Sequence, residues 1–74
     1  MTLSRDIVTT EDEFALETRL YVVLRRASGR VIDLVWFRQN REYADAILDY
    51  AESISDRDAK ETAKKLRFYR QFSH

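Results

Sequence analysis

One segment of the chain, residues 40–54, has a clear helical periodicity and limits the folds open to the rest. Its sequence is NREYADAILDYAESI, and its apolar residues recur at the spacing of one helical face: Tyr43, Ile47, Tyr50, Ala51 and Ile54. Charged residues take most of the remaining surface. A single amphipathic helix of about four turns is only marginally stable in water. The neighbouring segments must therefore cover its apolar stripe.

The composition indicates a helical chain held together by ordinary packing. The 74 residues include one Gly, no Pro and no Cys, so few turns are expected and disulfides are excluded. The one histidine is the last residue, His74. A core of this size stabilises a fold only modestly, which leaves packing or oligomerisation to hold it. We expect a single helical domain over 1–74, without a cofactor or a metal.

Capping residues divide the chain into three main helices. Thr10 and Glu13 have the spacing of an N-terminal capping box, and Gly29 supplies the left-handed residue that commonly ends a helix. Ser55, followed by Asp58, is expected to cap the last helix. We therefore predict an all-α bundle, with a loose arm over 1–9 and helices over 10–28, 31–54 and 56–71.

The segment 31–37, VIDLVWF, is compatible with two structures. Its β-branched and aromatic residues suit a strand. Paired with residues 20–24, this strand would form a hairpin over 20–37, and the chain would have a ββαα fold. This arrangement is the alternative to the helical bundle.

The helical interpretation of the same segment rests on two further cap residues. Asp33 is suited to cap a short fourth helix over 34–38, and Asn40 is a usual cap residue for the helix that follows. Such caps would break the 31–54 helix near 39–40. We favour helix here, because the capping signals upstream already account for the preceding segment as a helix.

The sequence lacks the residues that most enzymes need. No nucleophile can pair with a histidine inside the fold, since His74 is terminal, and one Gly cannot make a Gly-rich phosphate loop. Two carboxylate pairs lie one turn apart, Glu13 with Glu17 and Asp45 with Asp49. We interpret both as solvated helix faces rather than metal sites. The chain is therefore not expected to be an enzyme.

Aromatic residues are more numerous than three short helices can easily bury. There are nine of them, and Tyr and Trp are residue types that dominate protein interfaces. We therefore expect a protein–protein interaction or regulatory module that self-associates as a homodimer. The expected exposed anchors are Tyr21, Trp36 and Phe68, although each also fits a core position.

A basic row on the last helix gives a second hypothesis. Lys60, Lys64 and Arg67 are spaced to lie on one side of that helix, where they could follow the phosphates of a nucleic acid. The formal net charge is zero, however, which argues against a general binder of polyanions. Nucleic-acid binding is therefore the alternative to the interaction module.

The charges form blocks of alternating sign. Residues 1–18 and 39–58 each carry a net charge of −4, whereas residues 19–38 and 59–74 each carry +4. Such blocks indicate either neighbouring elements that attract one another within one fold, or a self-complementary homodimer surface.

The sequence gives no signal for a membrane or for secretion. Its first residues contain no long apolar run, and no segment approaches the roughly 20 apolar residues of a membrane-spanning helix. We therefore expect a cytoplasmic protein that does not bind membranes.

Overall fold

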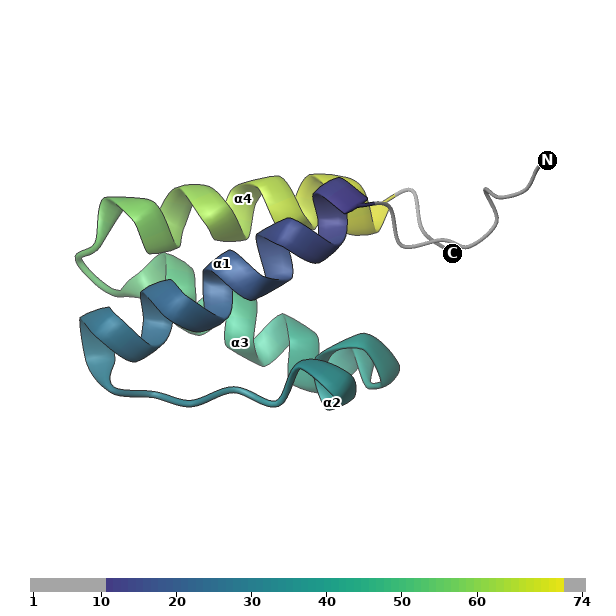
Figure 1. Cartoon of the computed structure of the whole chain (residues 1–74), viewed down its shortest axis with the longest axis horizontal. Helices are drawn as coiled ribbons and strands as arrows, with labels where there is room; N and C mark the ends of the chain where they lie inside the picture. The colour runs from purple at the N-terminus through teal and green to yellow at the C-terminus, as the bar shows by residue number, and fades with distance from the viewer. Residues whose placement is uncertain (1–10, 72–74) are drawn as a thin grey trace, which may run out of the picture.

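A computed structural model describes residues 11–71 of the chain, which form four α-helices (Figure 1). The helices are α1 (Glu11–Ser28), α2 (Leu34–Gln39), α3 (Arg41–Ser53) and α4 (Arg57–Gln71). The predicted all-α bundle is confirmed. The alternative hairpin over 20–37 is wrong, because residues 20–24 lie in α1, residues 34–37 lie in α2, and residues 31–33 form no strand. The expected arm over 1–9 and Thr10 of the predicted capping box lie outside the described residues.

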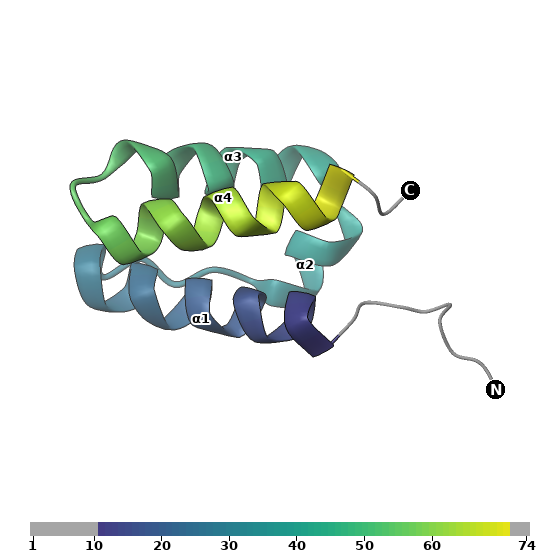
Figure 2. The same ribbon diagram turned by 90° about the horizontal axis from the view of Figure 1, so that it is seen from above.

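The three longer helices pack around one core. Helix α4 runs antiparallel to α1 and packs against both α1 and α3 (Figures 1 and 2). Helix α2 is short and packs mainly on α3, with a smaller contact to α1. The extended segment between α1 and α2 returns along the length of α1 (Figure 1). This return path brings α2 back toward the first turns of α1.

Large apolar side chains fill the core, and alanines let the helices approach one another. Among the described residues, the largest fully buried apolar side chains are Phe37, Leu20, Leu24, Ile47, Leu48 and Leu66. Four alanines of α3 and α4 are also fully buried, namely Ala44, Ala51, Ala59 and Ala63. Small side chains at these positions allow the close packing that protein interiors require.

The junctions around α2 follow the cap residues of the sequence. Gly29 has a φ of 77°, and its N–H donates to the Arg25 carbonyl oxygen at 2.9 Å, as expected for a helix end. The Asp33 carboxylate accepts from the Trp36 N–H at 3.0 Å, so α2 begins at Leu34. The predicted start of a helix at residue 31 is therefore wrong.

The predicted break near 39–40 is present at Asn40. Its backbone is extended, and its side-chain oxygen accepts from the Tyr43 N–H at 2.8 Å. Asn40 thus ends α2 and caps α3, which separates the predicted 31–54 helix into two helices joined at a bend.

The predicted cap of α4 is wrong by one residue. Asp56, not Ser55, accepts a hydrogen bond from the Ala59 N–H, at 3.0 Å, and the Asp56 carbonyl accepts from the Lys60 N–H at 3.1 Å. A carboxylate satisfies the free N–H groups and also interacts favourably with the positive end of the helix dipole. Asp56 therefore holds the start of α4 better than the Ser55 hydroxyl could.

Replacing Asp56 with alanine is expected to lower the free energy of unfolding by about 1 kcal/mol, because the Ala59 N–H loses its partner. The matched control is Ser55→Ala, which is expected to change the free energy by less than about 0.5 kcal/mol. Urea titrations of both variants, followed by circular dichroism, measure the difference. A larger loss for Ser55→Ala would contradict this assignment of the cap.

Candidate interaction surfaces

An exposed tryptophan on α2, Trp36, is connected to Tyr43 and Asp33 by one stacking contact and two hydrogen bonds. The Trp36 ring stacks on the Tyr43 ring, with centroids 4.4 Å apart and an interplanar angle of 17°. The Tyr43 hydroxyl accepts from the Asp33 N–H at 3.0 Å, and the Asp33 carboxylate accepts from the Trp36 N–H. We call these three residues, Asp33, Trp36 and Tyr43, the Trp36 cluster.

The Trp36 cluster presents a large apolar surface at low entropic cost. The side chain of Trp36 is 50% exposed, even though Tyr43 covers part of it. Helix α2 has only six residues, and Phe37 takes the buried position of this helix. Trp36 is therefore directed outward. Because the ring is already stacked on Tyr43, a partner would have less freedom of the side chain to remove on binding.

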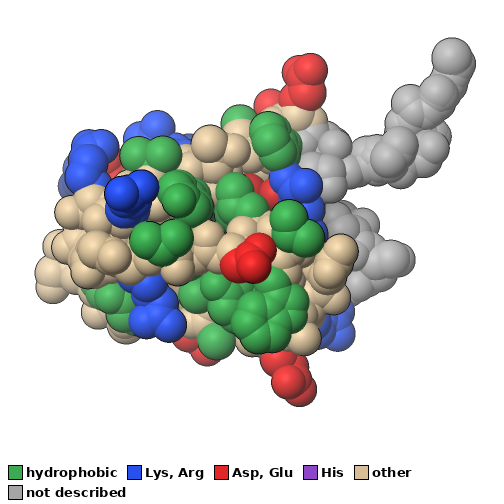
Figure 3. Space-filling view, turned by 60° about the horizontal axis from the view of Figure 1, so that its bottom comes forward, with side chains coloured by type: hydrophobic (Ala, Val, Ile, Leu, Met, Phe, Trp, Pro, Cys, Tyr) green, Lys and Arg blue, Asp and Glu red, His purple; other side chains and the backbone are tan. Residues whose placement is uncertain are grey.

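Other hydrophobic side chains lie exposed near the Trp36 cluster. Val35, on the same helix, and Val31, in the segment before it, are more than half exposed. Phe14 of α1 is also half-exposed and lies under the Arg38 guanidinium, 4.9 Å from its ring centroid. Figure 3 shows hydrophobic side chains gathered on this face of the molecule. We call the exposed side chains of Val31, Val35 and Trp36 the α2 surface.

The three predicted anchors do not form one site. Trp36 is exposed on α2, as expected, and Phe68 is 59% exposed on α4. Phe68 lines a groove between α1 and α4, whereas α2 lies below the α1–α4 pair in Figure 1. Tyr21 is half-buried and packs against the core. The predicted set therefore divides into one core-packed residue and two separate exposed ones.

The basic row of α4 is partly neutralised. The Arg67 guanidinium donates to Asp49 at 2.5 Å and to Glu52 at 2.9 Å, both on α3. Burial alone would lower the pKa of Arg67, but these two carboxylates outweigh that effect and raise it. Lys60 and Lys64 remain exposed. Two lysines rather than three cations are thus available to phosphates, which weakens the nucleic-acid alternative.

The salt bridges run between neighbouring charge blocks of the sequence. The pairs Glu17–Arg38, Asp49–Arg67 and Glu52–Arg67 each join an acidic block to the basic block that follows it. Attraction between elements within one fold therefore accounts for at least part of the alternating pattern.

One of the two predicted solvated carboxylate pairs is buried. Asp45 and Asp49 are exposed on α3 as expected. Glu17, by contrast, is only 1% exposed, and its neighbour Glu13 is also buried. Arg38 reaches back from α2, and its Nε lies 2.6 Å from Glu17 Oε1. The interpretation of Glu13 and Glu17 as a solvated face is therefore wrong.

The buried carboxylates share a small charged cluster with two arginines. The pKa of Glu13 is raised, first by burial and then by the nearby charge of Glu17, whereas Arg70 and Arg38 act in the opposite direction. The Arg70 guanidinium lies over the Phe37 ring, 5.1 Å from its centroid. We call Glu13, Glu17, Arg38 and Arg70 the buried charge cluster, which joins α1, α2 and α4.

The buried charge cluster shows no sign of a metal site. Within residues 11–71, no group of three or more His, Cys, Asp or Glu side chains is placed to hold a metal ion.

The same part of the chain contains no helix with the length and apolar character needed to cross a bilayer.

Comparisons with known proteins add no family to these observations. Neither the protein-family models, nor the curated proteins, nor the solved structures gave a match to this chain. The function therefore has to be argued from the surfaces themselves.

Proposed function

We propose that this chain is a small, non-enzymatic interaction module that self-associates through the α2 surface. The observation that carries this proposal is Trp36, a half-exposed tryptophan whose ring stacks on Tyr43 and whose backbone N–H is capped by Asp33. Tryptophan and tyrosine are enriched among the residues that carry most of the energy of an interface. The proposal keeps the cytoplasm as the place of action.

Three features favour a second copy as the partner at the α2 surface. The surface is apolar and comes from one short stretch of chain, so two copies can face each other across a two-fold axis. The formal net charge is zero, so two copies approach without net repulsion. A chain of 74 residues also has a modest core, which burial of exposed side chains in a dimer would extend.

The molar mass in solution tests this proposal directly. We expect sedimentation equilibrium to show a reversible dimer at micromolar to millimolar concentration. Trp36→Ala should weaken the dimer at least about tenfold, as expected when an interface anchor is truncated. Trp36 is also the only tryptophan, so its emission should move to shorter wavelength as the concentration of wild-type chain rises.

Phe68→Ala is the matched control for this experiment, because it truncates an equally exposed aromatic side chain away from α2. It should leave both the dimer constant and the emission shift unchanged. A monomer at all concentrations, or equal dimerisation of wild type and Trp36→Ala, would contradict the proposal.

A further inference from the structure

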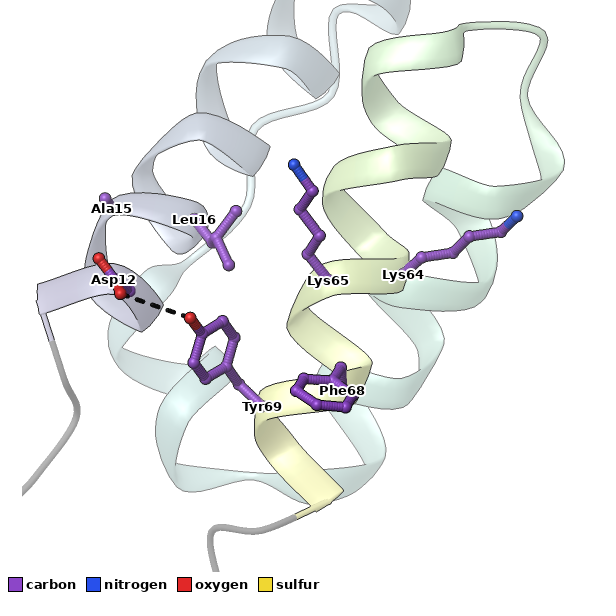
Figure 4. A pocket seen from close by; sticks show the side chains of 7 residues that line it. All are labelled: Asp12, Ala15, Leu16, Lys64, Lys65, Phe68 and Tyr69. Carbon is purple, nitrogen blue, oxygen red and sulfur yellow. Dashed lines mark hydrogen bonds between the residues drawn. The ribbon is translucent and has the colours of Figure 1, made fainter.

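A groove between α1 and α4 lies away from the α2 surface. It has a volume of about 630 Å³ and is lined by residues of the first two turns of α1 and the second half of α4: Asp12, Ala15, Leu16, Lys64, Lys65, Phe68 and Tyr69. Figure 4 shows Leu16, Lys65 and Tyr69 in the space between the two antiparallel helices, whereas Ala15 and Lys64 point away from it. The groove is open to solvent along about one and a half turns of each helix.

Apolar side chains line one part of the groove. Leu16 is half-buried between the helices, and Phe68 is more than half exposed at the edge. The rings of Phe68 and Tyr69 meet edge to face, with centroids 6.1 Å apart. The Tyr69 hydroxyl donates to the Asp12 carboxylate at 3.5 Å, which joins the two walls at one end (Figure 4). Leu16, Phe68 and Tyr69 together form the apolar part of the groove.

Positive charge lies on the α4 side of the apolar part of the groove. Lys65 extends into the space between the helices, whereas the Lys64 side chain extends from α4 in the direction away from α1 (Figure 4). Neither lysine takes part in a salt bridge with another residue of the described part of the chain. Two exposed carboxylates offset part of this charge: Glu61, one turn earlier on α4, and Asp12, which lines the α1 side of the groove. Arg19, one turn beyond Ala15 on α1, adds a further exposed cation.

We propose that the α1–α4 groove binds an acidic amphipathic helix of another protein. Apolar residues of that helix would cover Leu16 and Phe68, and its flanking carboxylates would face Lys64 and Lys65. Laying the apolar face of a helix into a groove is a common mode of peptide recognition. The open shape favours such a segment over a small molecule, which is usually enclosed on most sides.

A second copy of this chain does not supply such a helix from its described residues. Helix α3 is acidic on its exposed side, with Asp45 and Asp49, but its apolar stripe of Ala44, Ile47 and Leu48 is already buried in the core. The proposed ligand is therefore a helix of a different protein rather than α3 of a second copy, and its binding is independent of the self-association proposed for the α2 surface.

The test uses a synthetic helix-forming peptide with Leu at i, i+3, i+4 and i+7 and Glu at the flanking positions. It is titrated to millimolar concentration into the ¹⁵N-labelled full chain, carrying Trp36→Ala to exclude self-association. We expect amide shifts confined to residues 12–19 and 61–69. Affinity should fall as salt is raised, because exposed charges are screened. A second peptide, with Lys in place of every Glu, should bind at least about tenfold more weakly.

Variants of α4 separate the groove from the rest of this helix. Phe68→Ala, and the pair Lys64→Glu with Lys65→Glu, should each weaken binding of the Glu peptide about tenfold or more. Lys60→Glu is the control, because on the same helix but outside the groove it makes the charge change that each single substitution of the pair makes.

Three results would overturn the proposal. They are the absence of groove shifts at millimolar peptide, equal affinity for the Glu and Lys peptides, and an equal effect of Lys60→Glu and the double variant. None of these results bears on self-association through Trp36, which is measured separately on the chain alone.

Discussion

Replacing Phe37 with alanine should lower the free energy of unfolding by about 3–5 kcal/mol, the range found for truncation of fully buried aromatic residues. Phe37 has no exposed surface and is the buried anchor of α2. A helix of six residues cannot hold its structure alone, so α2 depends on this ring. A domain of this size has a total stability of roughly 4–11 kcal/mol. The variant is therefore expected to lose between about a third of its stability and all of it.

Val35→Ala is the matched control for Phe37→Ala, because Val35 lies two residues earlier on the same helix and is mostly exposed. It is expected to change the free energy of unfolding by less than about 0.5 kcal/mol. Urea titrations followed by circular dichroism report global unfolding, and Trp36 fluorescence reports α2 specifically. A loss below about 1 kcal/mol for Phe37→Ala would show that α2 is not anchored through this ring.

The fold could be predicted from sequence wherever local chemistry decides the backbone. Gly29, Asp33 and Asn40 each act within a few residues, through a left-handed φ or a side chain that caps the next helix. The β-branched residues of 31–37 suggested a strand as well, because strand propensity depends strongly on context. Here Asp33 starts a helix at Leu34 instead, and Asn40 ends it.

Sequence signals failed where two local candidates compete. Ser55 and Asp56 are both good cap residues and adjacent in the chain, so a choice between them shifts the start of α4 by one residue. The sequence does not show which of the two adopts the extended backbone of a cap. That choice depends on how the connection between α3 and α4 closes, which packing decides.

The exposed aromatic residues could be predicted only in part. Trp36 and Phe68 are exposed as expected, whereas Tyr21 packs against the core cluster. All three lie beside apolar stripes, and their exposure depends on where α2 and α4 lie across α1. The periodicity of the sequence cannot tell which of these side chains is exposed, because the packing of the helices against one another decides it.

The buried charge cluster could not be found from charge spacing alone. Glu13 and Glu17 lie one turn apart, which is also the pattern of a solvated helix face. Their positions nevertheless continue the line of the buried Leu20 and Leu24 along α1, and this line was the one available signal. Arg38, the partner of Glu17, is 21 residues away in the sequence. Only the return of the chain through α2 brings the two together.

Replacing Arg38 with methionine should lower the free energy of unfolding by about 2–3 kcal/mol. The substitution keeps most of the side-chain volume but leaves the Glu17 carboxylate buried without its partner. Removing one member of a buried pair typically costs about 3–5 kcal/mol. We expect the lower part of this range or less, since the Arg38 side chain is 38% exposed and water can partly replace it.

A double variant distinguishes the unpaired charge from the lost packing. Combining Arg38→Met with Glu17→Leu removes both charges and should recover most of the lost stability, because apolar replacement of a buried ion pair is often neutral or stabilising. Chemical unfolding of the wild type, both single variants and the double variant completes the cycle. If the double variant were as unstable as the sum of the two single variants, packing and not charge pairing would be the role of Arg38.

The pH dependence of the Arg38→Met variant supplies an independent check. The pKa of Glu13 is already raised above its ordinary value of 4.5 by burial and by Glu17, and loss of Arg38 removes one of the charges that counteract this shift. A carboxyl whose folded pKa is raised binds more protons in the folded state, so its favourable contribution is lost as pH rises through that pKa. The stability difference between variant and wild type should therefore be largest near neutral pH and should shrink as pH falls toward 4.5. A difference that stays constant over this range would mean that Arg38 does not stabilise the ionised carboxylates of α1.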